Sequence, residues 1–331
     1  MTKPKVYVTR QLFKPAIDFL ENHCSVEVFD GDDNPIPRDV LLKKIKDVEG
    51  LLCLLTEKID KEVFDSGKKL KVVSNYAVGF DNIDVDEASE RGIYVTNTPG
   101  ILTETTADCA FALMMAVSRR IVEGDKNIRA KKWVHAWGPK MFIGYDIYGK
   151  TLGIVGLGRI GTAMTKRAKG FDMKVIYYDP IRRKDLEKEY DIIFTPFLDL
   201  LAQADFVSIH VPLTKETHQL IGEKQFKKMK KTSFLINTSR GPIVDENALY
   251  NALKTKTIAG AGIDVFEKEP IDPMNPLIEL SNIVMTPHIA SASIDTRTAM
   301  AMMAATNLVA VLEGKDPPNA VNPEIKNSIK K

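Results

Sequence analysis

Three side chains that can act on a small organic acid each follow a short apolar run in the second half of the sequence. They are Arg240, Glu269 and His288. A guanidinium offers a planar pair of donors that matches a carboxylate, and imidazole exchanges protons near neutral pH. A carboxylate beside an imidazole favours the imidazolium and orients the ring. The trio therefore suits reduction of a 2-oxo acid, with Arg240 binding the acid and His288 donating a proton.

A glycine-rich turn supplies the second chemical signal. Gly156, Gly158 and Gly161 have the spacing GxGxxG, between an apolar run at residues 152–155 and a segment of helical composition. These glycines permit a tight turn, a close approach of the backbone to a pyrophosphate, and close packing of helix on strand. The helix N-terminus attracts the phosphates. An ordinary α/β turn is the alternative, but strand, turn and helix together predict that the chain binds a dinucleotide.

An acidic residue completes this dinucleotide signal. Asp179 ends the next apolar run, eighteen residues past Gly161. At that strand end a carboxylate accepts a hydrogen bond from a ribose 2′-hydroxyl and repels a 2′-phosphate. The sequence therefore predicts a preference for NAD(H). The neighbouring Arg182 and Arg183 leave NADP(H) open as an alternative.

Parallel strands must position these residues, and the sequence supplies two sets of short apolar runs. Helical segments separate most of the runs, and this alternation is typical of βαβ units. Because ligands of such sheets bind at the carboxyl ends of the strands, the candidate residues are expected at one edge. The predicted fold class is α/β with two doubly wound domains. The expected strands are residues 6–9, 26–29, 50–55, 71–75 and 92–95, then 152–155, 174–178, 206–210, 234–237, 261–264 and 283–285.

The order of these elements predicts the domain organisation. The glycine-rich turn does not open the chain, so the residues before it must form a domain of their own, flavodoxin-like in plan. A helix at about 103–120 is expected to carry the chain to the second domain, and an Ala- and Met-rich helix from about 290 leads back. We therefore expect a substrate-binding domain of residues 1–100 plus 290–331 and a dinucleotide-binding domain of residues 101–289.

Composition limits the class of protein and of partner. The 331 residues are 44% hydrophobic and 27% charged, with a formal net charge of +2. These values are ordinary for a globular protein and indicate neither a nucleic-acid nor a membrane partner. Cys24, Cys53 and Cys109 are far apart in apolar contexts, so we expect no disulfide framework and no metal site. With no signal-peptide pattern, the predicted location is the cytoplasm.

Seven stretches carry a resemblance to a known family. Together and in this order they resemble the D-isomer-specific 2-hydroxyacid dehydrogenases, and within that family they are most similar to the glyoxylate and hydroxypyruvate reductases. The resemblance implies a Rossmann NAD-binding domain inserted into a flavodoxin-like substrate-binding domain, and a homodimer. It also implies Arg240 as substrate binder, Glu269 as partner of the histidine and His288 as acid/base. The stretches are SNYAVGFDNID, TNTPGILTETTAD, GIVGLGRIG, HVPLT, INTSRGPIVDENAL, AGAGIDVFEKEP and TPHIASA.

The same resemblance implies further binding residues. The backbone N–H groups of Val78 and Gly79 would hold the substrate carboxylate, and Leu54 would line the pocket unless it is a core residue. Trp137 would reach the partner subunit's active site, with interface packing as its alternative role. The implied cofactor contacts are Thr106, Gly156, Gly158, Arg159, Ile160, Gly161, Asp179, Val211, Pro212, Thr217, Thr238, Arg240, Asp264, His288 and Ala290.

The leading functional prediction is reduction of a small 2-oxo acid, glyoxylate or hydroxypyruvate first, to the D-2-hydroxy acid with NAD(P)H. A second hypothesis is a dehydrogenase of the same family that acts on another substrate: D-lactate, 2-ketogluconate, phosphite or phosphoglycerate. A third reading is a non-catalytic, NADH-sensing protein similar to the transcriptional corepressors of this family. Tight NADH binding without turnover of any 2-oxo acid would favour that third reading.

Overall fold

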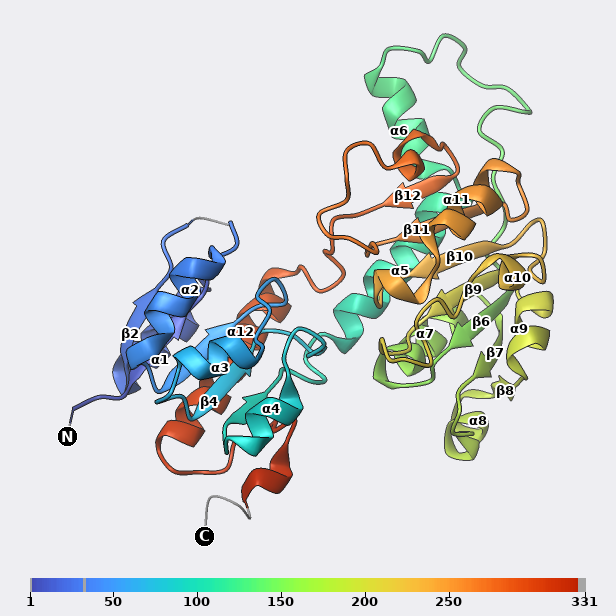
Figure 1. Ribbon diagram of the computed structural model, residues 1–331. Coiled ribbons are helices and arrows are strands. Elements are labelled where there is room, and N and C mark those ends of the chain that lie inside the picture. The colour runs from blue at the N-terminus through green and yellow to red at the C-terminus, as the bar shows by residue number, and fades with distance from the viewer. Residues whose placement is uncertain (1, 32–33, 327–331) are drawn as a thin grey trace. The chain divides into compact units, whose positions relative to one another are not determined.

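The chain forms two compact units. Unit 1 comprises Met1–Leu102 and Ala292–Lys331, and unit 2 comprises Thr103–Ser291. The computed structural model describes residues 2–31 and 34–326 (Figure 1). Each unit has its own parallel sheet with helices on both faces.

The sheet of unit 1 has five parallel strands in the order β2-β1-β3-β4-β5. This is the flavodoxin-like order, in which the chain moves outward from β1 in both directions. The central β3 (sequence GLLC) is buried along its whole length, as expected for a strand covered on both faces. The strands are β1 (Lys5–Val8), β2 (Ser25–Val28), β3 (Gly50–Cys53), β4 (Val72–Asn75) and β5 (Tyr94–Thr96).

Two layers of helices cover this sheet. One layer packs through residues such as Leu20 and Leu308, and the other packs through residues such as Leu41 and Phe64. Beyond the last long helix the chain returns to the sheet, where the Val321 N–H donates to the Val95 carbonyl at 2.8 Å. The first layer is α1 (Lys14–His23) and α12 (Ile294–Leu312), and the second is α2 (Arg38–Lys44), α3 (Lys61–Ser66) and α4 (Val85–Glu90).

The sheet of unit 2 has seven parallel strands in the order β12-β11-β10-β9-β6-β7-β8. Counted from β6, this is the Rossmann order with one strand added at an edge, and the order reverses between β6 and β9. Six of these strands follow the predicted runs, whereas the two-residue β8 was not predicted. The strands are β6 (Thr151–Val155), β7 (Lys174–Tyr178), β8 (Ile193–Phe194), β9 (Phe206–Ile209), β10 (Phe234–Asn237), β11 (Gly260–Ile263) and β12 (Ile283–Met285).

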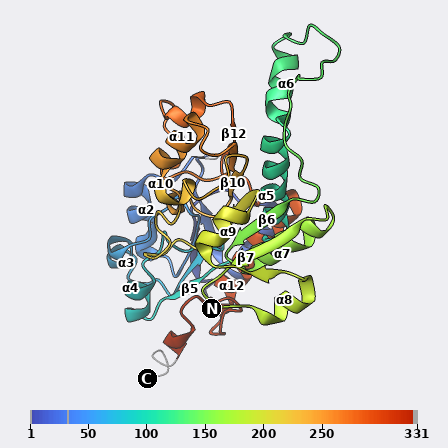
Figure 2. The ribbon, with the colours of Figure 1, turned by 90° about the vertical axis from the view of Figure 1, so that its right-hand side faces the viewer.

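Helices cover both faces of this second sheet as well (Figure 2). Met114, Met164 and Leu186 belong to the core on one face, and Leu200 and Leu249 belong to the core on the other. The predicted α/β class with two doubly wound sheets is confirmed. The first face carries α5 (Thr103–Ser118), α7 (Arg159–Lys169) and α8 (Lys184–Tyr190), and the second carries α9 (Phe197–Gln203), α10 (Glu223–Phe226) and α11 (Glu246–Lys254).

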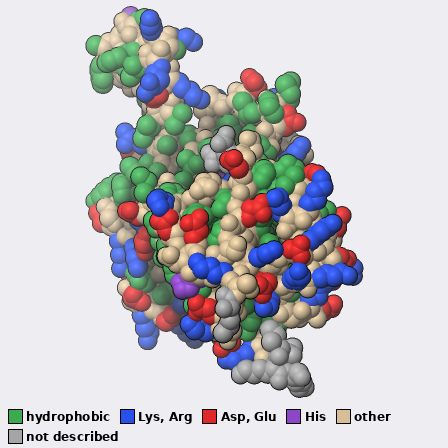
Figure 3. Space-filling view, turned by 90° about the vertical axis from the view of Figure 1, so that its left-hand side faces the viewer, with side chains coloured by type: hydrophobic (Ala, Val, Ile, Leu, Met, Phe, Trp, Pro, Cys, Tyr) green, Lys and Arg blue, Asp and Glu red, His purple; other side chains and the backbone are tan. Residues whose placement is uncertain are grey.

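One part of unit 2 extends away from its sheet. Arg120 has a left-handed backbone (φ 54°), which ends α5 and starts a separate helix, α6 (Ile121–Arg129), that the sequence did not predict. Residues 130–149 follow as a loop without helix or strand. We call residues 121–149 the arm. The space-filling view shows hydrophobic side chains beside basic ones on the arm, at the top of the picture (Figure 3).

Within residues 2–31 and 34–326, no helix combines the length and the apolar character that crossing a membrane requires. The described part of the chain also contains short 3₁₀ turns at Ile45–Asp47, Gly241–Ile243, Pro276–Glu279 and Pro323–Ile325.

Candidate active site

The glycine-rich turn connects β6 to α7 and has the geometry that a pyrophosphate requires. Gly156 has a φ of +95°, and a Cβ there would lie 2.8 Å from the backbone nitrogen of Val211. A Cβ on Gly161 would lie 2.2 Å from the Gly156 carbonyl oxygen, so only glycine lets the helix approach the turn. At Gly158, by contrast, a Cβ would meet no atom within 4 Å. The first and third glycines serve packing, and the second leaves open space.

This open space lies at the N-terminus of α7. The N-cap residue Gly158 has no side chain to accept from the first turn of the helix. The first N–H groups of any helix lack intrahelical partners and carry partial positive charge. Arg159 and Ile160 are the first two residues of α7, so their N–H groups lie at the helix end that attracts anions. Their contact with a pyrophosphate stays a prediction.

The Asp179 carboxylate reaches the same turn. Its Oδ2 accepts from the Leu157 N–H at 2.9 Å, and its Oδ1 accepts from the Ile181 N–H at 2.9 Å. These two bonds fix the carboxylate at the end of β7 beside the glycine turn. A carboxylate oxygen has two acceptor positions, so both oxygens can still accept from a ribose hydroxyl.

The loop after β9 is held by its own hydroxyl groups. The Thr217 hydroxyl donates to the Pro212 carbonyl at 2.6 Å and accepts from the Thr214 N–H at 2.7 Å. Ser239 donates to the Val211 carbonyl and so ties this loop to the loop after β10. The predicted contacts Val211, Pro212 and Thr217 therefore lie in one braced segment that follows the point where the strand order reverses.

Two threonines predicted to touch the cofactor are both buried. Thr106 is buried in the second turn of α5. The Thr238 hydroxyl is also buried, and it finds no hydrogen-bond partner among the described residues. Because a buried hydroxyl without a partner is costly, this group marks a place where a polar ligand atom fits. A nicotinamide carboxamide would supply such an atom.

The turn that carries Arg240 is fixed from within. The Asn237 side chain accepts from the Ser239 N–H and donates to the Arg240 carbonyl, both at 3.0 Å. A Cβ on Gly241 would stand 1.9 Å from the Phe266 backbone, so glycine is required where the loops after β10 and β11 meet. Arg240 itself is half-buried and donates to the Ser239 carbonyl at 2.9 Å. The sequence did not single out Asn237 or Gly241, although both belong to the INTSRGP stretch.

His288 and Glu269 lie in direct contact at the carboxyl edge of unit 2. The His288 Nδ1 and the Glu269 Oε2 are 2.7 Å apart, and the Phe266 N–H donates to Glu269 Oε1 at 3.0 Å. His288 has a left-handed backbone (φ 54°), and its side chain is 32% exposed. With Nδ1 bound to the carboxylate, Nε2 is the ring nitrogen left for proton transfer.

The electrostatics of this pair favour the ionised carboxylate. Burial is the largest single influence and raises the pKa of the Glu269 carboxyl. The hydrogen bond and charge of His288, the Phe266 N–H and the charge of Arg240 lower this pKa, and their sum exceeds the effect of burial. The pKa of Glu269 therefore lies below its ordinary value. At neutral pH the carboxylate is ionised and can hold the imidazole in one orientation.

Asp264 anchors the loop that carries His288. Its fully buried carboxylate accepts from the Thr286 hydroxyl at 2.5 Å, the Ile289 N–H at 2.8 Å and the Ala290 N–H at 2.7 Å. The His288 N–H also donates to the Asp264 carbonyl at 2.9 Å. The sequence suggested Asp264 and Ala290 only as cofactor contacts. The structure shows that Asp264 holds the chain on both sides of the histidine, while its contact with a cofactor stays a prediction.

In unit 1, side-chain amides hold the loop predicted to bind the substrate carboxylate. Asn97 donates to the Val78 carbonyl and Asn75 donates to the Gly79 carbonyl, both at 2.8 Å. Because these carbonyls are fixed, the orientations of the adjoining peptide groups are restricted. The sequence identified Val78 and Gly79 but neither asparagine.

A buried charged cluster supports Leu54, which is half-buried at the end of β3. The Glu57 carboxylate accepts from the Leu54 N–H and the Thr9 hydroxyl, both at 2.7 Å, and lies 3.4 Å from Arg10. Asn82 donates to the Leu54 carbonyl at 3.0 Å. No motif in the sequence announced this cluster, because its members come from three separate loops.

Two residues, His210 and Trp137, make none of the contacts described above. Burial lowers the pKa of His210 to about 3, and the Nε2 of this neutral ring lies 2.8 Å from the Ser208 hydroxyl. Across the residues that the structure describes, no group of three or more His, Cys, Asp or Glu side chains could hold a metal ion. The predicted contact role of Trp137 stays a prediction, since this residue of the arm is 78% exposed.

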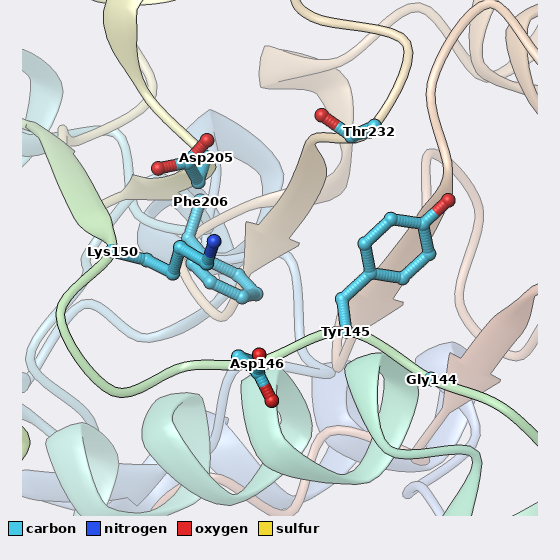
Figure 4. Close-up of a pocket in the computed structure, with 7 residues that line it drawn as sticks. All are labelled: Gly144, Tyr145, Asp146, Lys150, Asp205, Phe206 and Thr232. Carbon is cyan, nitrogen blue, oxygen red and sulfur yellow. The ribbon is translucent and has the colours of Figure 1, made fainter.

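A hollow of about 240 Å³ lies at the opposite edge of unit 2, where β6, β9 and β10 begin. Figure 4 shows Lys150 and Phe206 on one side of it and Tyr145 on the other. One of its two acidic residues, Asp205, already accepts from the Thr151 N–H and the Lys230 ammonium group. This hollow is therefore separate from the edge that carries His288.

Comparison with known proteins identifies what the chain is similar to. Residues 111–290 match the family model described as D-isomer specific 2-hydroxyacid dehydrogenase, NAD binding domain. The glyoxylate reductase of Korarchaeum cryptofilum is 55% identical over 323 residues, which cover 98% of this chain and 97% of that protein.

Solved structures show the same likeness. A crystal structure of a Thermus thermophilus protein has a TM-score of 0.90 at 45% identity, covering 96% of this chain and 99% of that one. An NADPH-dependent glyoxylate/hydroxypyruvate reductase of Sinorhizobium meliloti has a TM-score of 0.84 at 30% identity, covering 97% and 98%. Both likenesses extend over residues of unit 1 and unit 2.

Proposed function

Because the chain belongs to the D-isomer-specific 2-hydroxyacid dehydrogenase family, we propose that it reduces glyoxylate and similar small 2-oxo acids, such as hydroxypyruvate, with NADH. The family makes it an NAD(P)-dependent dehydrogenase. The product is the corresponding 2-hydroxy acid, of D configuration where it is chiral. The observation that carries the proposal is the contact between His288 and Glu269 at the strand edge that also bears Arg240.

The proposed mechanism assigns one task to each of these side chains. The bound nicotinamide supplies a hydride to the substrate carbonyl carbon. Arg240 binds the substrate carboxylate and polarises the carbonyl through its planar donors. His288 donates the proton from Nε2 to the carbonyl oxygen, while the Glu269 carboxylate on Nδ1 orients the ring.

Unit 1 has a binding role in this proposal. The N–H groups of Val78 and Gly79 hold the substrate carboxylate, and the Leu54 side chain lines the pocket for a small substituent. The hydrogen bonds from Asn75 and Asn97 support this assignment, because they fix the loop without occupying its N–H groups. Unit 1 is then the substrate-binding domain, and unit 2 is the dinucleotide-binding domain.

The proposed cofactor is NAD(H). The open space at Gly158, the uncapped start of α7 and the buried Thr238 hydroxyl all fit a dinucleotide. Asp179 supports NADH over NADPH, since its carboxylate would accept from a free 2′-hydroxyl and repel a 2′-phosphate. NADP(H) is the alternative, as the Sinorhizobium meliloti reductase is NADPH-dependent.

The proposed assembly is a homodimer through the arm. Trp133, Val134, Trp137, Ile143 and Tyr148 are all more than half exposed. A group of exposed apolar side chains of this kind marks an interaction surface, and the family resemblance names a second copy as its occupant. Light scattering should give a dimer mass, and Trp137→Ala should lower turnover if this side chain serves the partner subunit's site.

A single assay tests the proposed reaction. Purified protein is mixed with NADH or NADPH and with glyoxylate, hydroxypyruvate, pyruvate or 2-ketogluconate, and loss of reduced cofactor is followed by absorbance. We expect fast turnover of glyoxylate or hydroxypyruvate with NADH. Faster turnover with NADPH would refute the cofactor assignment alone. Tight NADH binding without turnover of any acid would refute the reductase and favour an NADH-sensing protein.

A further inference from the structure

Two arginines follow Asp179, and their side chains are already engaged by acidic residues of α8. A 2′-phosphate on the adenine ribose is normally recognised by an arginine near this strand end. Arg182 and Arg183 are placed for that task in the sequence. Their contacts show why the chain would nevertheless disfavour NADP(H).

Arg182 is held on two sides. Its Nε and Nη2 donate to Glu187 Oε1 and Oε2 at 2.8 and 3.0 Å, which is a bidentate pair of parallel hydrogen bonds. Its guanidinium carbon also lies 5.5 Å from the centre of the Phe194 ring. Two of the five N–H donors of this guanidinium are therefore used, and the pair with Glu187 fixes the direction in which the remaining donors point.

Glu187 is itself fixed in place. Its side chain is only 17% exposed, and the Tyr177 hydroxyl donates to its Oε1 at 2.9 Å. The Tyr177 oxygen in turn accepts from the Arg183 N–H at 2.8 Å. The hydrogen bonds from Arg182 hold the pKa of the Glu187 carboxyl below its ordinary value, so it is ionised at neutral pH.

The second arginine is restrained less firmly. Arg183 donates to the two Asp185 oxygens at 3.2 and 2.8 Å, but Asp185 is 63% exposed. Pairs between exposed side chains contribute little and are screened by salt. Arg182 is itself 53% exposed, but its partner Glu187 is largely buried and fixed by Tyr177, so of the two cations Arg182 is the one with a firmly placed partner.

We propose that Glu187 determines cofactor specificity by holding Arg182 away from the 2′-phosphate of NADP(H). The inference rests on the proposed NAD(H) preference and on the dinucleotide site at the glycine turn. Asp179 then excludes the phosphate directly, and Glu187 withholds the cation that would otherwise bind it. Both carboxylates therefore act at the adenine-ribose end of the cofactor. Asp179 repels the phosphate of the ligand, and Glu187 holds an arginine of the protein.

The test measures cofactor binding rather than turnover. Dissociation constants for NADPH and NADH are obtained by fluorescence titration of Glu187→Gln in the wild-type and Asp179→Ser backgrounds. Glutamine keeps the size of the side chain and an acceptor for Tyr177 but removes the charge that holds Arg182. Glu189→Gln on the same helix is the matched control, because Glu189 is exposed and its side chain interacts with Tyr190 rather than being the ion-pair partner of Arg182.

We expect Glu187→Gln to tighten NADPH binding by roughly threefold to tenfold, with the larger gain in the Asp179→Ser background. The NADH dissociation constant of Glu187→Gln should stay within about twofold of the value in the same background without that substitution. In Glu189→Gln the dissociation constants of both cofactors should stay within the same limit. Adding Arg182→Ala to Glu187→Gln should remove the gain. The proposal is overturned if NADPH binding does not tighten in either background, if both cofactors change together, or if the gain survives Arg182→Ala.

These titrations separate this inference from the proposed reaction. If the protein turns over no 2-oxo acid but Glu187→Gln still tightens NADPH binding, the role of Glu187 is supported and the proposed reaction is refuted. If the protein is an active reductase but Glu187→Gln does not tighten NADPH binding, the proposed reaction is supported and the role of Glu187 is refuted.

Discussion

The two ends of the proposed dinucleotide site in unit 2 are built differently. At the end that carries His288, a fully buried carboxylate, Asp264, accepts three hydrogen bonds from the loop around the histidine. At the ribose end, Arg182 and Arg183 sit on the surface in ion pairs with side chains of one short helix. The first end is braced by buried groups, and the second is held by contacts that salt and substitution can change.

This difference fits the two tasks. Proton transfer requires a donor within hydrogen-bond distance of the reacting atom, so a small displacement of the ring has a large effect on rate. Choice between two cofactors that differ by one phosphate requires only a modest difference in binding free energy. The comparison predicts that substitutions near His288 reduce turnover strongly and that substitutions near Asp179 alter cofactor preference.

The largest effect is expected for His288→Ala. Loss of a general acid lowers turnover by about a hundredfold to ten-thousandfold. NADH binding should remain, because the glycine turn and Asp179 are untouched. Steady-state kinetics with glyoxylate and fluorescence titration with NADH measure the two quantities. A parallel loss of NADH binding and turnover would show that His288 supports the structure instead.

The next effect is expected for Asp264→Asn. An amide has one acceptor oxygen, so at least one group among Thr286, Ile289 and Ala290 loses its partner on a fully buried side chain, which costs about 1–3 kcal/mol. Both the melting temperature and turnover should fall, since the backbone at His288 is released. Asp272→Asn, in an exposed loop of the same unit, is the control. Unchanged turnover in a destabilised protein would refute the positioning role.

A smaller effect is expected for Asp179→Ser. Serine removes the charge that repels a 2′-phosphate, so the NADPH to NADH ratio of kcat/KM should rise by about tenfold. The Leu157 and Ile181 N–H groups lose the carboxylate, whose two oxygens one serine hydroxyl cannot replace, and NADH binding should weaken for that reason too. Kinetics with both cofactors at fixed glyoxylate measure the ratio. An unchanged ratio would contradict the predicted cofactor preference.

Much of this arrangement could be predicted because it depends on patterns local in the sequence. The apolar runs predicted both sheets, since strands buried on both faces need no other signal. Arg240, Glu269 and His288 could be selected because each follows such a run, and parallel strands bring those positions to one edge. The glycine spacing predicted the turn before α7 for the same local reason.

Other features could not be predicted, because they depend on contacts and backbone conformations that apolar runs and short motifs do not reveal. Nothing local distinguishes Asp264 as an anchor until the left-handed backbone at His288 turns the next two N–H groups toward it. Glu187 reaches Arg182 only because α8 begins directly after the arginines. The strand β8 has only two residues, one of them exposed. The helix α6 follows the left-handed residue Arg120, where the predicted helix ends, and none of its residues is buried, so no core-facing pattern indicates it.

The smallest expected effect is the pH dependence that Glu269 gives to stability. Its folded pKa lies below its ordinary value, so the ionised form favours folding at every pH above that ordinary value. This stabilising contribution is lost as the pH falls from the ordinary pKa of a glutamate toward the lower pKa of Glu269 in the folded protein. Glu269→Gln should therefore melt below wild type above about pH 5, and the gap should close in more acidic buffer. Because the carboxylate is 37% exposed, the gap should correspond to less than about 1 kcal/mol. A difference in melting temperature that does not change with pH would show that Glu269 stabilises the fold by packing and not by its charge. Asp264 would then be the one carboxylate whose charge stabilises the end that carries His288.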